Sequence, residues 1–178
     1  WKKEIIYWKL EGLRRILHER QKGRGVLMCD CDVTFRAPVQ ETYEADVVLS
    51  PNYWGRTDLL VSNPEHHYNS ELHLVHGLIN AGYVMASHEY VAQKWLELYL
   101  NGIGGFYEQK LLELFPQLFR VAFFDARHNF GKWRFASPNS DVISLHTHLR
   151  EEARNCNAPA NAEIKLMAQQ AGAKARFH

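Results

Sequence analysis

The stretch Val26-Leu-Met-Cys-Asp30-Cys-Asp32 is the most informative segment of this chain of 178 residues. Its first four residues form a short continuous apolar run, which is typical of a strand buried on both faces of a sheet. Two carboxylates spaced two apart at a strand end project to the same side, where they repel each other unless a cation lies between them. Because carboxylate oxygens suit Mg²⁺ or Mn²⁺, the stretch predicts a strand that ends in a metal site. The alternative is a turn that carries two solvated acids.

Helical and strand patterns continue on both sides of this stretch. Upstream, apolar residues recur at helical spacing and predict an amphipathic helix: Ile6, Leu10, Leu13 and Leu17. Downstream, we expect strands at residues 45–49, 77–86, 121–124 and 142–145, and helices at 87–100, capped by Ser87, and at 107–115. This alternation predicts an α/β fold with a mostly parallel mixed sheet flanked by helices, and the site at the carboxyl ends of its strands. Residues 51–76 are predicted to form a long loop that is functional or mobile.

Length and composition favour one globular domain. We expect it at residues 1–150, followed at 151–178 by a helical or partly disordered tail rich in Ala, Gln and Asn. A net charge of +1 lacks the basic excess of a nucleic-acid-binding protein, and the apolar runs are too short to span a bilayer. The chain opens on Trp1 without an initiator Met, which suggests an excerpt of a longer protein.

The three cysteines, Cys29, Cys31 and Cys156, do not form the pattern of a disulfide framework. We interpret Cys29 and Cys31 as small buried hydrophobes. This interpretation favours a reducing compartment and therefore the cytoplasm, with the Golgi lumen as the alternative if the chain is a fragment.

Two histidines, His146 and His148, follow the expected strand at 142–145. A neutral imidazole is a common metal ligand. We predict His146 as the ligand in preference to His148, because His146 directly ends the strand. The alternative is that one histidine packs in the core and the other is solvated.

The segment Asn80-Ala81-Gly82 interrupts the apolar pattern of the expected strand at 77–86. A glycine inside a strand often marks the close approach of a ligand or of another backbone. The asparagine offers both a donor and an acceptor to sugar hydroxyls. A β-bulge is the alternative.

Two further segments combine polar groups in patterns that suit a sugar nucleotide. Glu108-Gln109 opens the helix at 107–115, where a carboxylate would act as a base or stabilise charge on a sugar ring; the alternative is an acid favoured there by the helix dipole. The loop His128-Asn-Phe-Gly-Lys132-Trp offers aromatic faces and amides to a sugar, and Lys132 would meet a phosphate. The alternative is an ordinary capped loop around a buried tryptophan.

Taken in order, these segments resemble the glycosyltransferases of the GT-A fold. Residues 26–35, with Pro38 after them, look like the DxD segment and its trailing proline, and residues 78–85 are similar to the strand that lines the donor sugar. Trp95 lies in the following helix, where such families often place a tryptophan. Glu108-Gln109 resembles the acidic pair at the next helix start, and residues 143–146 resemble a last strand that ends in a metal-ligating histidine. The resemblance covers about residues 5–148.

This resemblance implies a metal-dependent transfer of a sugar from a nucleoside diphosphate donor, with UDP-sugars favoured, to a hydroxyl of a glycan, protein or small-molecule acceptor. The resemblance implies that Asp32 and His146 bind Mn²⁺ or Mg²⁺, and that Asp30 binds the metal or the ribose. The residues implied at the donor are Asn80, Ala81, Gly82 and Lys132. Glu108 and Gln109 are implied to lie near the anomeric carbon. The nearest families have an Asp-Gln pair, and several of them are retaining. Glu108 replaces that aspartate, so the stereochemical outcome stays open.

Two alternatives account for parts of the same pattern. A phosphatase of the haloacid-dehalogenase type would use Asp30 as the nucleophile and Asp32 as acid and base, but His146 and Asn80 would then have no role. A binding module without catalysis would use aromatic residues such as Tyr53, Trp54 and Tyr68 for a sugar or a partner protein. The strand and loop that bind the base in the GT-A fold do not precede the first helix, which favours the module or an N-terminal truncation.

Overall fold

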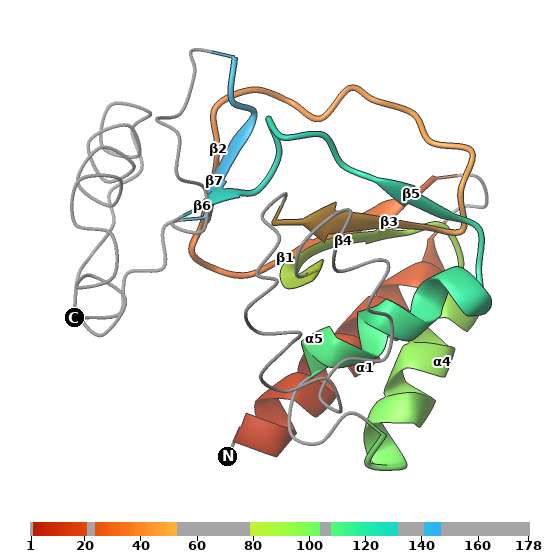
Figure 1. The fold of residues 1–178 in the computed structure, drawn as a ribbon. Coiled ribbons are helices and arrows are strands. Elements are labelled where there is room, and N and C mark those ends of the chain that lie inside the picture. Colours follow the sequence, from red (N-terminus) through yellow and green to blue (C-terminus); the bar gives the residue numbers. More distant parts are fainter. Residues whose placement is uncertain (1, 21–23, 53–78, 104–107, 132–140, 147–178) are drawn as a thin grey trace, which may run out of the picture. The chain divides into compact units, whose positions relative to one another are not determined.

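The computed structural model describes residues 2–20, 24–52, 79–103, 108–131 and 141–146 (Figure 1). The chain divides into two compact units. The first unit consists of Trp1–Cys29 with Tyr43–Phe123, and the second consists of Asp30–Thr42 with Phe124–His178. The tail expected at 151–178 lies outside the described residues. Among the described residues, no helix has the length and apolar character needed to cross a membrane.

A four-stranded sheet forms one layer of the first unit. Its strands are β1 (Val26–Cys29), β3 (Val47–Pro51), β4 (Ile79–Ala86) and β5 (Val121–Phe123), in the spatial order β1-β4-β3-β5. β4 runs antiparallel to both of its neighbours, and β3 is parallel only to β5. The expectation of an α/β fold is confirmed, but the expectation of a mostly parallel sheet is wrong. Strand–helix alternation predicts parallel neighbours only where a crossover returns the chain in the same direction, and here that holds for β3 and β5.

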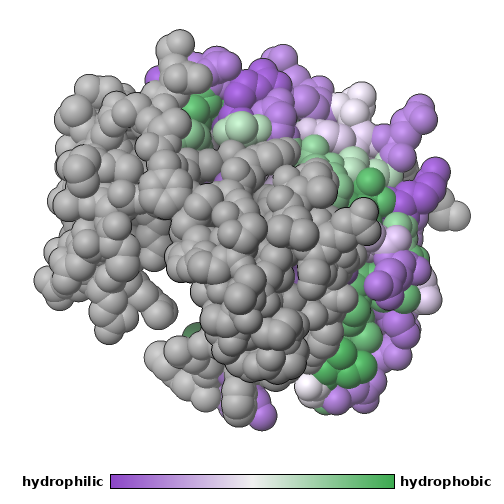
Figure 2. All heavy atoms as spheres, viewed as in Figure 1, coloured by the Kyte–Doolittle hydropathy of each residue, from purple (hydrophilic) through white to green (hydrophobic). Residues whose placement is uncertain are grey.

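The other layer of the first unit is helical. α1 (Lys2–Glu19), α4 (Glu89–Leu100) and α5 (Glu108–Leu111) lie on one face of the sheet (Figure 1). The predicted apolar stripe of α1 is buried in the core of this unit, which confirms the periodicity argument. Trp95 of α4 is fully buried, and its indole N–H donates to the carbonyl oxygen of Glu108 at 3.0 Å. On the face drawn in Figure 2, hydrophobic residues also reach the surface over this helical layer.

Two helix boundaries differ from the sequence expectation. Ser87 does not cap α4, because the cap position is His88 and the Ser87 hydroxyl instead donates to the carbonyl oxygen of Asp46 at 2.9 Å. The helix expected at 107–115 is α5 followed by a 3₁₀ turn over Leu112–Gln117. Pro116 lies inside that turn and cannot donate the backbone hydrogen bond to the carbonyl oxygen of residue 112 that a continuing α-helix would contain.

β1 and β4 also differ from the sequence expectation, in burial and in regularity. β1 is only half-buried and Cys29 and Cys31 are exposed, so the expected burial of this strand and of both cysteines is wrong. β4 is continuous through residues 80–82, but Val48 pairs with Met85 whereas Ser50 pairs with Asn80. Extra residues of β4 therefore face a short segment of β3, which is the bulge-like irregularity considered as an alternative for Asn80-Ala81-Gly82.

The second unit contains a three-stranded sheet. Its strands are β2 (Val33–Phe35), β6 (Phe130–Gly131) and β7 (Ser144–His146), with β7 in the centre. β7 runs antiparallel to β2 and parallel to β6, and Phe130, Val142 and Leu145 form its hydrophobic cluster. The strand expected at 142–145 therefore lies at 144–146. β2 and β6 were not expected, because strands of three and two residues leave too little periodicity to recognise.

Candidate metal centre

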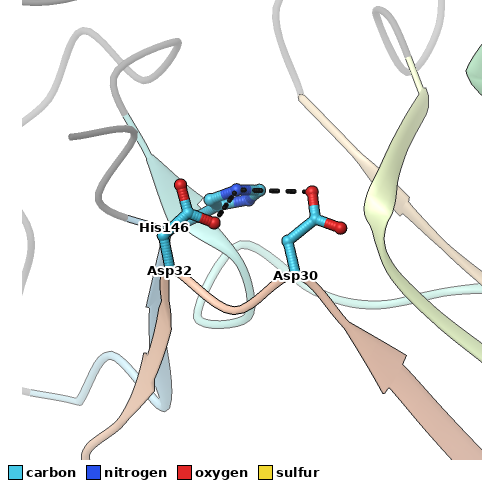
Figure 3. A group of neighbouring side chains, drawn as sticks. All are labelled: Asp30, Asp32 and His146. Carbon is cyan, nitrogen blue, oxygen red and sulfur yellow. Dashed lines mark ion pairs between the residues drawn. The ribbon is translucent and has the colours of Figure 1, made fainter. Parts of the chain in front are cut away.

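A tight turn carries the two aspartates. Asp30 follows the last residue of β1, Asp32 precedes the first residue of β2, and the backbone N–H of Val33 donates to the carbonyl oxygen of Asp30 at 3.1 Å. The turn closes over Cys31 and Asp32, so Asp30 lies at its first position and Asp32 within it, and both side chains extend from this short segment (Figure 3). The sequence spacing thus brings the carboxylates together through a turn rather than through one face of a strand.

The central strand of the second unit supplies the histidine. His146 pairs with Val33 across the β2–β7 ladder, which places its imidazole beside Asp32. Its Nε2 lies 3.0 Å from Oδ1 of Asp32 and 3.9 Å from Oδ2 of Asp30. The imidazole is buried, whereas the carboxylates keep 39% and 29% of their side-chain surface exposed. Both carboxylates point toward the imidazole in Figure 3.

The donor set of Asp30, Asp32 and His146 fits a divalent cation. The three ligand atoms lie within 4.8 Å of one another. Adjacent ligands of an octahedral ion at about 2.1 Å are separated by about 3.0 Å, and opposite ligands by about 4.2 Å. The distances from Nε2 to the two carboxylates fall within this range. Two oxygens and one imidazole nitrogen suit Mn²⁺ or Mg²⁺, and partly exposed carboxylates give a small ligand access to the remaining positions.

The second nitrogen of His146 is also engaged. Nδ1 of His146 lies 2.9 Å from Oδ1 of Asn129, and the backbone N–H of Asn129 donates to the hydroxyl of Ser144 at 2.8 Å. Sequence reasoning missed this role, because it placed Asn129 in a sugar-facing loop. The structure buries Asn129 completely, at the end of a turn that precedes β6. The available signal was an asparagine directly before a short apolar segment, since asparagine tolerates the left-handed backbone that such a position adopts.

A second group in the same unit has a similar composition. Glu41, Asp125 and His128 also bring two carboxylates and one imidazole within 4.8 Å. Here Nη2 of Arg127 lies 3.0 Å from Oε1 of Glu41 and 2.6 Å from Oδ2 of Asp125, so one guanidinium bridges both carboxylates. Nε2 of His128 lies 3.2 Å from Oε1 of Glu41, and its buried ring packs on Phe124. The chain itself supplies the cation of this group, which we call the arginine cluster.

Electrostatics agree with that description of the arginine cluster. Hydrogen bonds from Arg127 hold the pKa of Asp125 below its ordinary value. Burial tends to raise the pKa of Glu41, but hydrogen bonds from its own backbone and from His128 outweigh this effect and lower it. The pKa of Arg127 is raised by the hydrogen bond to Asp125. All three groups are therefore charged near neutral pH, and they form an ion-pair cluster.

The residues expected at the donor sugar belong to the first unit. Asn80 is buried, and its Oδ1 accepts from the backbone N–H of Gly82 at 2.8 Å. The backbone N–H of Ala81 donates to Oε1 of Gln109 at 3.4 Å, so α5 and β4 do meet at these positions. The structure brings this part of the predicted site together within one unit.

Glu108 has two contacts that bear on its expected role. Its carboxylate lies 3.2 Å from Nζ of Lys9 on α1, and only 13% of its side-chain surface is exposed. Its backbone carbonyl accepts the indole hydrogen bond of Trp95. These contacts give Glu108 a packing role between helices of the first unit. Five other residues singled out in the sequence lie outside the described residues: Tyr53, Trp54, Tyr68, Lys132 and His148.

The chain matches no protein-family model and no curated protein.

Proposed function

We propose that this protein is a metal-dependent glycosyltransferase of the GT-A type, which moves a sugar from a nucleoside diphosphate donor to an acceptor hydroxyl. The observation that carries the proposal is the convergence of Asp30, Asp32 and His146, because Nε2 of a buried histidine faces both carboxylates of an Asp-x-Asp turn. The order of the other motifs along the chain supports the same assignment.

In this proposal Asp32 and His146 hold Mn²⁺ or Mg²⁺, and Asp30 binds the ion or the ribose of the donor. The bound ion would supply charge neutralisation for the diphosphate as it leaves. The partly exposed carboxylates leave room for phosphate oxygens, while the buried imidazole fixes the inner side of the site. UDP-sugars are the favoured donors, and a glycan, protein or small molecule would supply the acceptor hydroxyl.

Asn80, Ala81, Gly82 and Gln109 form the proposed wall for the donor sugar. The hydrogen bonds from Gly82 to Asn80 and from Ala81 to Gln109 fix these groups on β4 and α5. The catalytic assignment of Glu108 rests on the resemblance alone, since Lys9 holds its carboxylate. Lys132 is proposed to bind a donor phosphate on the same basis.

The test is nucleotide release from a panel of UDP- and GDP-sugars, with Mn²⁺ or with EDTA. Wild type, Asp32→Asn and Asp125→Asn form the matched set, because both substitutions neutralise an aspartate of the second unit. We expect Mn²⁺-dependent release from one donor, its loss in Asp32→Asn, and its retention in Asp125→Asn. Release that is independent of metal, or equal in wild type and Asp32→Asn, would contradict the proposal.

The contact between His146 and Asp32 also bears on the phosphatase alternative. The carboxylate of Asp32 lies 3.0 Å from the imidazole of His146. This position favours a role for Asp32 as a metal ligand over a role as the acid and base that acts on an aspartyl phosphate. Phosphate release from phosphomonoesters, lost in Asp30→Asn, would favour the phosphatase. A folded protein that binds Mn²⁺ and a sugar, but releases nothing from any donor, would favour a binding module.

A further inference from the structure

We propose that Asn129 is the positioning residue of the metal centre, and that it selects the tautomer in which His146 presents Nε2 to the ion. This inference rests on the metal site of the proposed function and adds a residue that the resemblance does not include. Three buried side chains form the arrangement: Ser144, Asn129 and His146.

The proton on Nδ1 of His146 is placed by the contact with Asn129. A neutral imidazole has one N–H donor and one acceptor nitrogen, so whatever binds one nitrogen determines the role of the other. Oδ1 of Asn129 can only accept, so the 2.9 Å contact places the proton on Nδ1 of His146. Nε2 is then the ring nitrogen left for an ion, and it faces Asp32 and Asp30; a bound ion would replace any proton that Nε2 shares with Asp32.

Asn129 is itself held by its backbone. Its φ of 50° lies in the left-handed region, which asparagine and aspartate adopt more readily than most residues. Its backbone N–H donates to the hydroxyl of Ser144 at 2.8 Å. Ser144 and His146 are two apart on β7 and point to the same side, so one strand holds both ends of the arrangement.

Backbone hydrogen bonds join this turn to the segment that leads into β7. The carbonyl oxygen of Arg127 accepts backbone hydrogen bonds from Ile143 at 2.8 Å and from Ser144 at 3.3 Å. The backbone of the turn is thereby fixed against the start of β7. Outer partners of this kind orient a ligating histidine, and their loss weakens metal affinity by about 10- to 100-fold.

The test compares two substitutions that both suit the backbone at position 129. Asn129→Gly keeps the left-handed backbone conformation and removes the side-chain oxygen that accepts from His146. Asn129→Asp keeps the conformation and an accepting oxygen. We expect the Mn²⁺ dissociation constant, measured by electron paramagnetic resonance, to rise by about 10- to 100-fold in Asn129→Gly and to change by less than about threefold in Asn129→Asp. Equal affinity in wild type and a folded Asn129→Gly would overturn the proposal.

A second measurement does not need the metal. Nitrogen-15 NMR of the metal-free wild type, with the His146 signals assigned from a His146→Gln spectrum, reports which ring nitrogen carries the proton. We expect a proton on Nδ1 in wild type and Asn129→Asp, whether or not Nε2 also shares a proton with Asp32, and a population without a proton on Nδ1 in Asn129→Gly. A ring protonated at Nε2 alone in wild type would overturn the inference even if Asn129→Gly does not fold. Failure of wild type to bind Mn²⁺, with Nδ1 protonated as expected, would instead count against the proposed function and leave the positioning of His146 by Asn129 intact.

Discussion

The second unit contains two groups with the same ligand chemistry but different partners. The arginine cluster and the candidate metal centre each combine two carboxylates with a buried histidine. In the arginine cluster, a guanidinium bridges Glu41 and Asp125. In the candidate metal centre, the carboxylates of Asp30 and Asp32 converge on Nε2 of His146. The other ring nitrogen, Nδ1, contacts the side-chain oxygen of Asn129. Composition alone therefore does not define a metal site; a bridging guanidinium competes with a metal ion for the same oxygens.

The largest expected effect is on Mn²⁺ affinity, and it should appear when the candidate metal centre loses a carboxylate but not when the arginine cluster does. Asp32→Asn should weaken Mn²⁺ binding by more than about 100-fold, because in the proposed site Asp32 is a direct ligand of the ion, whereas Asn129 acts only through His146. Asp125→Asn should leave the dissociation constant nearly unchanged, because its carboxylate already binds Arg127. Titration of each variant with Mn²⁺, followed by electron paramagnetic resonance, measures the two dissociation constants. A similar loss in the two variants would remove the distinction between the groups.

A smaller effect should appear when the arginine cluster loses its cation. Arg127→Ala leaves Glu41, Asp125 and His128 close together without the guanidinium that bridges the carboxylates. The carboxylates of Glu41 and Asp125 then repel each other, and a cation that binds between them relieves this repulsion. We expect a lower melting temperature in EDTA and a second, weaker Mn²⁺ equivalent that wild type does not bind. Arg120→Ala, which removes an arginine of the first unit, is the control, and it should bind as many ions as wild type.

The smallest effect is a dependence of stability on pH. Because the folded pKa of Asp125 is lowered, its ion pair stabilises the protein above the unfolded value near pH 4, and this contribution is lost as the pH falls through the folded pKa. Asp125 is half exposed, so solvent screening limits the contribution to about 0.5–1 kcal/mol.

Urea unfolding of wild type and Asp125→Asn in EDTA, from pH 7 to pH 3, measures this contribution. The difference between the two proteins should stay constant down to about pH 5 and shrink below it. A difference that grows toward acid would mean that the pKa of Asp125 is not lowered by Arg127.

Local patterns allowed part of this structure to be predicted from the sequence. The stripe of α1 and the apolar run of β1 each lie within one element, so residue spacing is enough to recognise them. Asp30, Asp32 and His146 were recognised because each adjoins an apolar run at the end of an element. The structure brings these three residues together, and their ligation of a metal stays a prediction.

Features that depend on non-local pairing could not be predicted. The direction of β4 is set by partners at distant positions, and no residue of β4 encodes it alone. The exposure of Cys29 depends on what covers the end of β1, and its apolar neighbours gave the wrong expectation. The role of Asn129 is visible only once β7 lies beside β6, because its partners Ser144 and His146 come from another segment.

The pairing of β2 with β7 has a consequence for the order of events in folding. It joins residue 33 to residue 146, and closing so long a loop is entropically costly and slow compared with forming α1. The three donor atoms meet only when this closure is complete, so an ion that binds them would bind the native chain and not its precursors. Such an ion would lengthen the lifetime of the folded protein by slowing unfolding, and would leave the rate of folding unchanged.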